Sequence, residues 1–189
     1  MRLTLDTIRC NEDQLIEKAI SGDKEAFGQL YDRYFIQIYK YLLVRTNTQE
    51  DAEDMTENVF MKAWEHLPHF GGKKKDRNFR PWIYKIAHNT VVDHYRTRKH
   101  FLPLETALHI SLGEGEPGRI ALKNEESRRI IQVVKQLDEI SQRVIVSRFF
   151  GDLSHKETAL SIGINENNVR VIQYRALKKI KDMLREENE

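Results

Sequence analysis

Hydrophobic side chains recur at helical spacing along most of the chain. Between Asp23 and Arg45 they fall every three or four residues, which places them on one side of a helix. These positions are Phe27, Leu30, Tyr31, Tyr34, Ile38, Tyr41 and Leu42. Long alternating runs bounded by turn residues, which are typical of strands, are nearly absent. The pattern therefore predicts an all-α protein whose first long helix follows Ser21, Gly22 and Asp23.

A second helix is predicted from about Thr48 to Leu67. Thr48, with Asp51 three residues later, resembles a capping box, and Pro68 ends the helix. One face is largely apolar, with Ala52, Met55, Thr56, Val59 and Ala63. The opposite face carries Glu50, Asp54, Glu57, Asn58, Met61 and Glu65. A methionine among acids favours a docking surface for a basic partner, although an acidic face that meets only solvent fits the pattern equally well.

A third helix, from Phe79 to His100, is strongly basic. Its predicted core side comprises Phe79, Trp82, Ile83, Ile86, Ala87 and Thr90. From residue 73 to 99, nine Lys and Arg stand against two Asp, a local charge of +7. Among them lie the rings of Trp82, Tyr84, His88 and Tyr95. The cations can bind phosphates, and the rings can stack on unpaired bases. The segment therefore favours a protein that binds melted or single-stranded nucleic acid. A basic helix with buried aromatics and no ligand is the plainer alternative.

Glycine and proline mark two connecting segments. Residues 69–78, with paired glycines and a lysine run, are predicted to form a loop that leads into the basic helix. Residues 101–119 contain Pro103, Gly113, Gly115, Pro117 and Gly118, and no Lys or Arg before Arg119. We interpret 101–119 as a flexible acidic linker between two small helical domains, 1–100 and 120–189.

The second domain contains the most specific pattern in the chain. Helical spacing resumes at Ile120 and Leu122, and Ser141 is predicted to cap a helix that runs to Gly151. Ser154 and Glu157 then form a capping box before a short helix. After a turn at Gly163, Asn165 starts a helix whose inward positions are Val169, Ile172, Ala176 and Ile180. This pattern predicts a helix-turn-helix, because it combines a small residue at Ala159, a glycine in the turn and apolar positions on the following helix. The alternative is an ordinary pair of packed helices.

The outward side of that last helix is suited to DNA. It carries Asn167, Asn168, Arg170, Gln173, Tyr174 and Arg175, followed by Lys178, Lys179, Lys181 and Arg185. Amide and guanidinium groups near a helix N-terminus match the edges of bases, and the later lysines match phosphates.

Composition narrows the classes of function. Cys10 is the only cysteine, and the seven histidines have no recognised metal spacing, so no cofactor or metal is expected. We expect no membrane insertion and a cytoplasmic location, because no apolar run approaches 18 residues. The formal net charge is +2, yet residues 12–65 sum to −6 beside the basic segment. This division suggests two different partners.

The chain resembles a bacterial sigma factor of the extracytoplasmic-function (ECF) group. AEDMTENVFMKAWEHLPHF is similar to the family's helix that binds core RNA polymerase, and FRPWIYKIAHNTVVDHYRTRK to its segment that melts and reads the minus-10 element. The residues from Leu137 to Leu184 resemble its minus-35-reading domain. The resemblance implies a transcription initiation factor without enzymatic activity, whose partners are core RNA polymerase, promoter DNA and an anti-sigma factor.

The resemblance also implies three sets of site residues. Polymerase would contact Asp54, Glu57, Asn58, Met61 and Trp64. The minus-10 element would contact Lys75, Asp76, Arg77, Asn78, Phe79, Arg80, Trp82, Tyr84, Lys85, His88, Asn89 and Arg96. The minus-35 element would contact Asn167, Asn168, Arg170, Val171, Gln173, Tyr174, Arg175 and Lys178.

Two parts of the sequence depart from the family pattern. The family commonly has Leu-Pro where this chain has Leu137-Asp138, and the residues before Glu12 match nothing in it. A stand-alone helix-turn-helix regulator with a sensing or dimerising first half is the competing class. It explains the second domain equally well, but not the basic helix that directly follows an acid-faced one.

Overall fold

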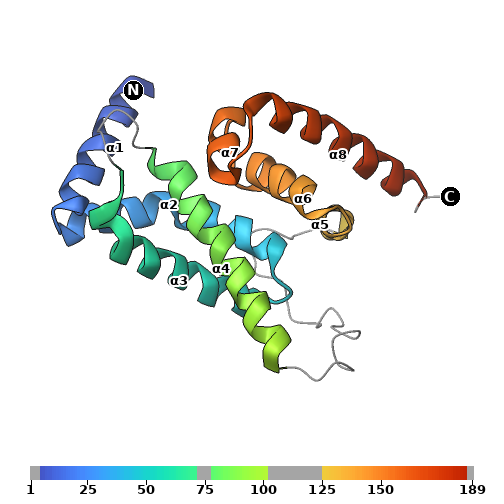
Figure 1. Ribbon diagram of the computed structural model, residues 1–189, viewed down its shortest axis with the longest axis horizontal. Helices are drawn as coiled ribbons and strands as arrows, with labels where there is room; N and C mark the ends of the chain where they lie inside the picture. The colour runs from blue at the N-terminus through green and yellow to red at the C-terminus, as the bar shows by residue number, and fades with distance from the viewer. Residues whose placement is uncertain (1–4, 72–77, 102–124, 187–189) are drawn as a thin grey trace.

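Helices form the whole regular structure of the described part of the chain. The computed structural model describes residues 5–71, 78–101 and 125–186, with side chains for 12–71, 78–97 and 128–186 (Figure 1). The elements are α1 (Leu5–Ile20), α2 (Lys24–Arg45), α3 (Gln49–His66), the short 3₁₀ turn η1 (Leu67–His69), α4 (Phe79–Phe101), α5 (Glu125–Lys135), α6 (Glu139–Ile145), the π turn η4 (Val146–Phe150), α7 (His155–Ile162) and α8 (Glu166–Glu186). The all-α prediction is confirmed for these residues.

The first domain packs α1, α3 and α4 around α2. Asp23 caps α2 by accepting a hydrogen bond from the Ala26 amide, and Thr48 caps α3 by accepting one from the Asp51 amide. The apolar positions predicted from spacing fill the core, with Leu30, Ile38, Val59 and Ala63 fully buried. The two predicted helix starts are therefore correct, and they set which faces of α2 and α3 point inward.

Helix α1 was not predicted. Its side chains Leu15, Ile16 and Ala19 are buried against the rest of the first domain. Glu12 completes the contact: its carboxylate accepts hydrogen bonds from Arg33 Nη1 at 3.0 Å and from the Tyr34 hydroxyl at 2.8 Å. A polar run from Asn11 to Gln14 separates Leu5 and Ile8 from Leu15, Ile16, Ala19 and Ile20, so the apolar periodicity of this helix is interrupted.

In the second domain, α5, α6, η4, α7 and α8 surround a small core. Ser154 and Glu157 make both bonds of a capping box, and Gly163 ends α7 with φ at 81°, as predicted. The expected cap of α6 is wrong. Asp138 accepts from the Ser141 amide, whereas Ser141 itself is buried one turn into the helix. Asp138 stands where the family commonly has proline, and its carboxylate caps the start of α6.

The two domains pack against each other. α7 lies beside α4 (Figure 1), and the short turn η4 contacts α2. Val134, Leu137, Ile145, Val146 and Leu153 of the second domain belong to the same buried apolar cluster as the first domain's core. Phe101, the first residue of the predicted linker 101–119, is instead the last residue of α4, and residues 102–119, Ile120 and Leu122 lie outside the described part of the chain.

Candidate nucleic-acid and polymerase interfaces

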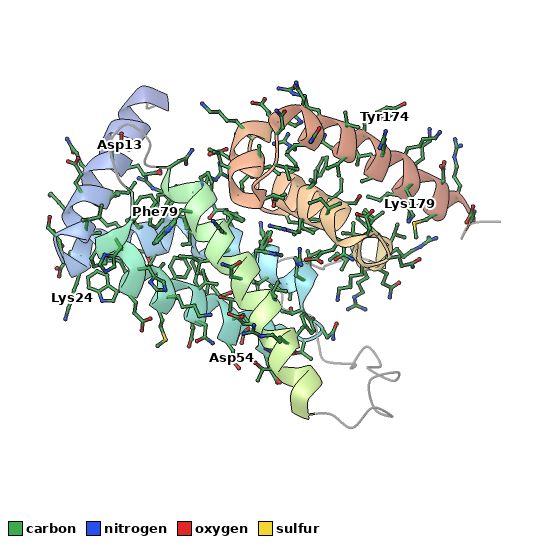
Figure 2. All side chains as sticks on the ribbon, viewed as in Figure 1. Asp13, Lys24, Asp54, Phe79, Tyr174 and Lys179 are labelled. Atoms are coloured by element: carbon green, nitrogen blue, oxygen red, sulfur yellow. The ribbon has the colours of Figure 1, made fainter. Side chains whose placement is uncertain are left out.

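The outward face of α3 is acidic and exposed. Asp54, Glu57 and Asn58 are exposed, and Met61 is 61% exposed despite its apolar side chain. Figure 2 shows Asp54 at the lower edge of the molecule, away from the second domain. Trp64 differs from the other predicted polymerase contacts: it is half-buried, and its ring centroid lies 5.0 Å from that of Phe27. The face can therefore meet a partner without any change in the core.

The residues predicted for the minus-10 element fall into three groups. Lys85, Asn89 and Arg96 are exposed on α4, while Asn78, Arg80, Trp82 and His88 are half-buried. Phe79 and Tyr84 are only 1% exposed. Lys75, Asp76 and Arg77 lie outside the described residues.

Tyr84 is not an exposed ring, which corrects the expectation drawn from the sequence, whereas Phe79 is buried on the core side, as its helical spacing predicted. Phe79 points into the first domain, where its ring packs on Tyr34, Phe70 and Trp82 (Figure 2). Tyr84 lies edge-on to Tyr41 of α2, with 5.2 Å between ring centroids, and its hydroxyl donates to the Gly151 carbonyl at 2.8 Å. α4 is covered on two sides, by its own domain and by the second one, so a single apolar stripe could not reveal Tyr84 as buried.

We predict a small but measurable role for the Tyr84 hydroxyl in stability. Tyr84→Phe should lower the free energy of unfolding by about 1 kcal/mol, because it removes one buried hydrogen bond. The Gly151 carbonyl would still accept from Arg80 Nη2 at 3.1 Å, so no acceptor is left without a partner. Urea unfolding followed by circular dichroism measures the change; an unaltered midpoint would contradict it.

The seam between the domains gathers positive charge around His88. Arg45 Nη1, His88 Nδ1 and Arg143 Nε are buried and have no hydrogen-bond partner among the described residues. Burial, together with the charges of Arg143 and Arg45, lowers the pKa of His88 from 6.5 to about 4. His88 is therefore neutral in the packed protein at neutral pH. Nothing in the spacing of the sequence indicates that Arg45 and Arg143 meet it.

The depressed pKa of His88 makes stability depend on pH. The unfolded chain takes up a proton near pH 6.5 and the packed one only near pH 4, so the stability contributed by neutral His88 is lost as pH falls through this window. We expect His88→Gln to flatten the decline between pH 6.5 and 4. Urea unfolding of both proteins at pH 7, 5.5 and 4.5 provides the comparison, and parallel curves would rule out His88 as the source.

The outward side of α8 presents amides and cations. Asn167, Asn168, Arg170 and Arg175 are exposed, as are Val171 and Lys178, and Tyr174, 72% exposed, stands out from α8 (Figure 2). Arg170 pairs with Glu166 one turn earlier at 2.5 Å. Both partners are exposed, so this pair contributes little to stability and leaves Arg170 available to a ligand.

Gln173 is held more tightly than its predicted outward position implies. It is half-buried, and its side-chain oxygen accepts a hydrogen bond from Arg148 Nε at 3.1 Å. Arg148 also donates to the Leu153 carbonyl, which ties η4 to the segment that enters α7. Sequence reasoning missed Arg148 as a residue that orients Gln173, because its partner is 25 positions away.

Comparisons with known proteins agree with this geometry. Residues 30–101 match the family model Sigma-70 region 2, and residues 133–182 match Sigma-70, region 4. NccH, an RNA polymerase sigma factor of Alcaligenes xylosoxydans xylosoxydans, is 30% identical over 179 residues, which cover 92% of this chain and 94% of NccH. The ECF RNA polymerase sigma factor BldN of Streptomyces coelicolor is 31% identical over 173 residues. This chain belongs to the ECF sigma factors.

The match to BldN covers 90% of this sigma factor and 65% of BldN, so the chain spans about two thirds of that relative's length. Among solved structures, CnrH in complex with the cytosolic domain of CnrY has a TM-score of 0.70 and 26% identity, covering 92% of this sigma factor and 97% of CnrH. The region 2 match explains the basic helix α4 as well as α3. A stand-alone regulator is therefore not supported, and the chain is a transcription initiation factor.

The described residues form neither a membrane-spanning helix nor a cluster of metal-binding side chains. Within residues 5–71, 78–101 and 125–186, no helix is long and apolar enough to cross a membrane. In the same residues, no group of three or more His, Cys, Asp or Glu is arranged to hold a metal ion.

Proposed function

We propose that three helices of this sigma factor each bind a different target. The outward face of α3 binds core RNA polymerase, α4 with the segment before it binds the opened minus-10 strand, and the outward face of α8 reads the minus-35 element. The observation that carries the proposal is the placement of charge. The acidic face of α3 and the amide and basic face of α8 belong to different domains, so both can be engaged at once.

The polymerase contact rests on exposed residues that the fold does not need. Asp54, Glu57 and Asn58 offer polar groups, and Met61 offers an adaptable apolar contact among them. A complementary basic surface would be steered toward this face.

The minus-10 contact rests on the exposed part of α4. Lys85, Asn89 and Arg96 are exposed to phosphates or bases in the present conformation, and the pair that Arg96 makes with Asp93 at 3.3 Å lies on the surface, where it contributes little. Arg80, Tyr84 and His88 lie at the seam with the second domain, so they would join the contact only after the domains separate.

The minus-35 contact rests on the first turns of α8. Asn167, Asn168 and Arg170 are exposed near the start of the helix, where a helix-turn-helix meets base edges. Lys178 is exposed two turns further along and is suited to a phosphate.

We also propose the domain limits 1–100, 101–119 and 120–189 and an anti-sigma factor as a protein partner. The structurally similar CnrH was solved with the cytosolic domain of another protein, CnrY, which supports such a partner here.

The test combines two binding assays. The purified chain is mixed with bacterial core RNA polymerase and passed over a sizing column, and it is titrated alone against duplex promoter fragments in a gel shift. We expect comigration with core polymerase and promoter binding only by the assembled complex. Tight duplex binding by the chain alone, without comigration, would contradict the proposal.

A further inference from the structure

Three buried nitrogen atoms meet at the seam between the domains. Arg45 Nη1, His88 Nδ1 and Arg143 Nε have no hydrogen-bond partner among the described residues. Arg45 and His88 belong to α2 and α4 of the first domain, and Arg143 belongs to α6 of the second. We call these three residues the seam cluster. Buried polar groups are nearly always hydrogen-bonded, so three such nitrogens in one place indicate a ligand.

Helix register brings the seam cluster together. The Tyr41 ring lies edge-on to the Tyr84 ring, with 5.2 Å between the centroids. Arg45 and His88 follow these rings by four residues and therefore lie on the same faces of α2 and α4. Arg143 completes the cluster from the second domain: burial and then the charges of Arg143 and Arg45 lower the pKa of His88. The three side chains thus converge from three helices.

The positive charge of the seam cluster is not neutralised by the chain. Arg45 and Arg143 form no ion pair with a carboxylate of the described residues. Glu139 is the acidic group that acts on Arg143, but it is exposed, so water screens it. Lys135 adds another cation at the same end of α2, where its ammonium donates to the Thr46 carbonyl at 2.6 Å. No Asp or Glu of the described residues is buried to oppose these cations.

The chemistry of the seam cluster requires an acceptor from outside the chain. Arginine nitrogens only donate, so Arg45 and Arg143 cannot satisfy each other, and a neutral imidazole can donate from Nδ1. Tyr41 is no substitute for an anion, because burial raises its pKa and keeps its hydroxyl neutral. Two uncompensated guanidinium groups favour an acceptor that carries negative charge.

Burial restricts that acceptor to a small monovalent ion. A ligand reaches the buried nitrogens only after it has shed its water, and the desolvation cost of an ion grows with the square of its charge. Phosphate and sulfate are therefore disfavoured, and a halide fits. A water molecule could accept the same hydrogen bonds, but it would leave the charge of the two guanidinium groups uncompensated.

We propose that the seam cluster is an anion site, in which Arg45, His88 and Arg143 together bind one halide ion of the chloride class. The site is complete only when both domains contribute their donors. It is independent of the polymerase and DNA contacts proposed above. Because the unfolded chain lacks the site, chloride stabilises the folded chain by mass action.

The test uses the full chain with Arg143→Met, and Arg128→Met as the matched control. Arg143→Met removes a donor and a charge but keeps an unbranched side chain. Arg128 is exposed on α5, where the same substitution removes the same charge away from the seam cluster. Thermal unfolding is followed by circular dichroism while sodium chloride replaces sodium gluconate at constant ionic strength. Gluconate is too large for a buried halide site, so only the available halide changes.

We expect chloride to raise the unfolding midpoint of the wild-type chain. With a dissociation constant of about 30 mM, an increase from about 10 to about 300 mM chloride raises the folded-to-unfolded ratio about eightfold, or the midpoint by about 4 °C. Arg128→Met should respond equally, and Arg143→Met should lose most of the response. An unresponsive wild type, or an equal response of Arg143→Met, would overturn the proposal.

Chlorine nuclear magnetic resonance provides a readout that stands even if Arg143→Met does not fold. Chloride that exchanges with a site on the protein has a broadened resonance, and bromide should displace it and narrow the line again. We expect this behaviour from the wild-type chain and Arg128→Met, and a loss of the broadening in Arg45→Met. A wild-type chain that causes no broadening, or broadening that bromide does not reduce, would overturn the halide site; a bound water would give the first of these results.

Discussion

Core RNA polymerase is expected to bind the Asp54→Lys variant about thirtyfold more weakly than the wild-type chain. Asp54 is exposed on the face of α3 opposite the buried Ala52, Val59 and Ala63, so the substitution leaves the core intact. Lysine is a good helix former, and α3 should keep its length. Reversal of a charge that faces a basic partner costs roughly 2 kcal/mol of binding free energy.

The matched control for Asp54→Lys is Asp13→Lys, which makes the same charge reversal on α1, at a different edge of the molecule (Figure 2). A competition assay against wild type for limiting core polymerase gives both affinities, and thermal unfolding gives both midpoints. Asp13→Lys should compete like wild type. If Asp54→Lys instead melts several degrees lower and competes equally well, the acidic face is structural and not a polymerase contact.

Substitutions of the base-contacting and the phosphate-contacting residues of α8 should affect promoter binding differently. Arg170→Ala should cost about 1 to 3 kcal/mol at the preferred minus-35 sequence and much less at altered ones, because a guanidinium at a base edge carries sequence discrimination. Lys178→Ala should weaken all sequences alike and reduce the salt slope of binding by about one unit, because it removes a phosphate contact.

The assay uses reconstituted holoenzyme on promoter variants at several salt concentrations. Glu166→Gln serves as the control, since it frees Arg170 from its only ion pair in the described structure and should not relax discrimination. The opposite result would be that Arg170→Ala weakens binding to all promoters equally while Lys178→Ala changes the base preference. It would show that α8 contacts DNA in another register.

Periodicity and capping chemistry predicted most of the fold within each domain. The apolar spacing from Phe27 to Leu42 identified α2, and the carboxylate or hydroxyl before each helix identified the starts of α2, α3 and α7. The helix-turn-helix followed from Ala159, Gly163 and Val169, which are buried or in a left-handed turn as predicted. These features depend on neighbours within a few positions, and such neighbours can be read from a sequence.

Contacts between the domains could not be predicted in that way. Tyr84 carries the pattern of an exposed ring because the surface that buries it comes from Gly151, 67 positions later. Gly151 itself indicated only a helix end, although its main role is to leave room for Tyr84. Likewise, Arg45, His88 and Arg143 are distributed over three helices, and only the folded chain brings them together.

The central claim is that this chain directs RNA polymerase to promoters through α3, α4 and α8. The most direct measurement mixes the purified chain with core RNA polymerase and genomic DNA of its own organism, and maps the 5′ ends of the transcripts. The account predicts starts that appear only with the chain present and share two sequence elements, near minus 35 and minus 10. Starts that are identical with and without the chain, or that share no upstream elements, would contradict it.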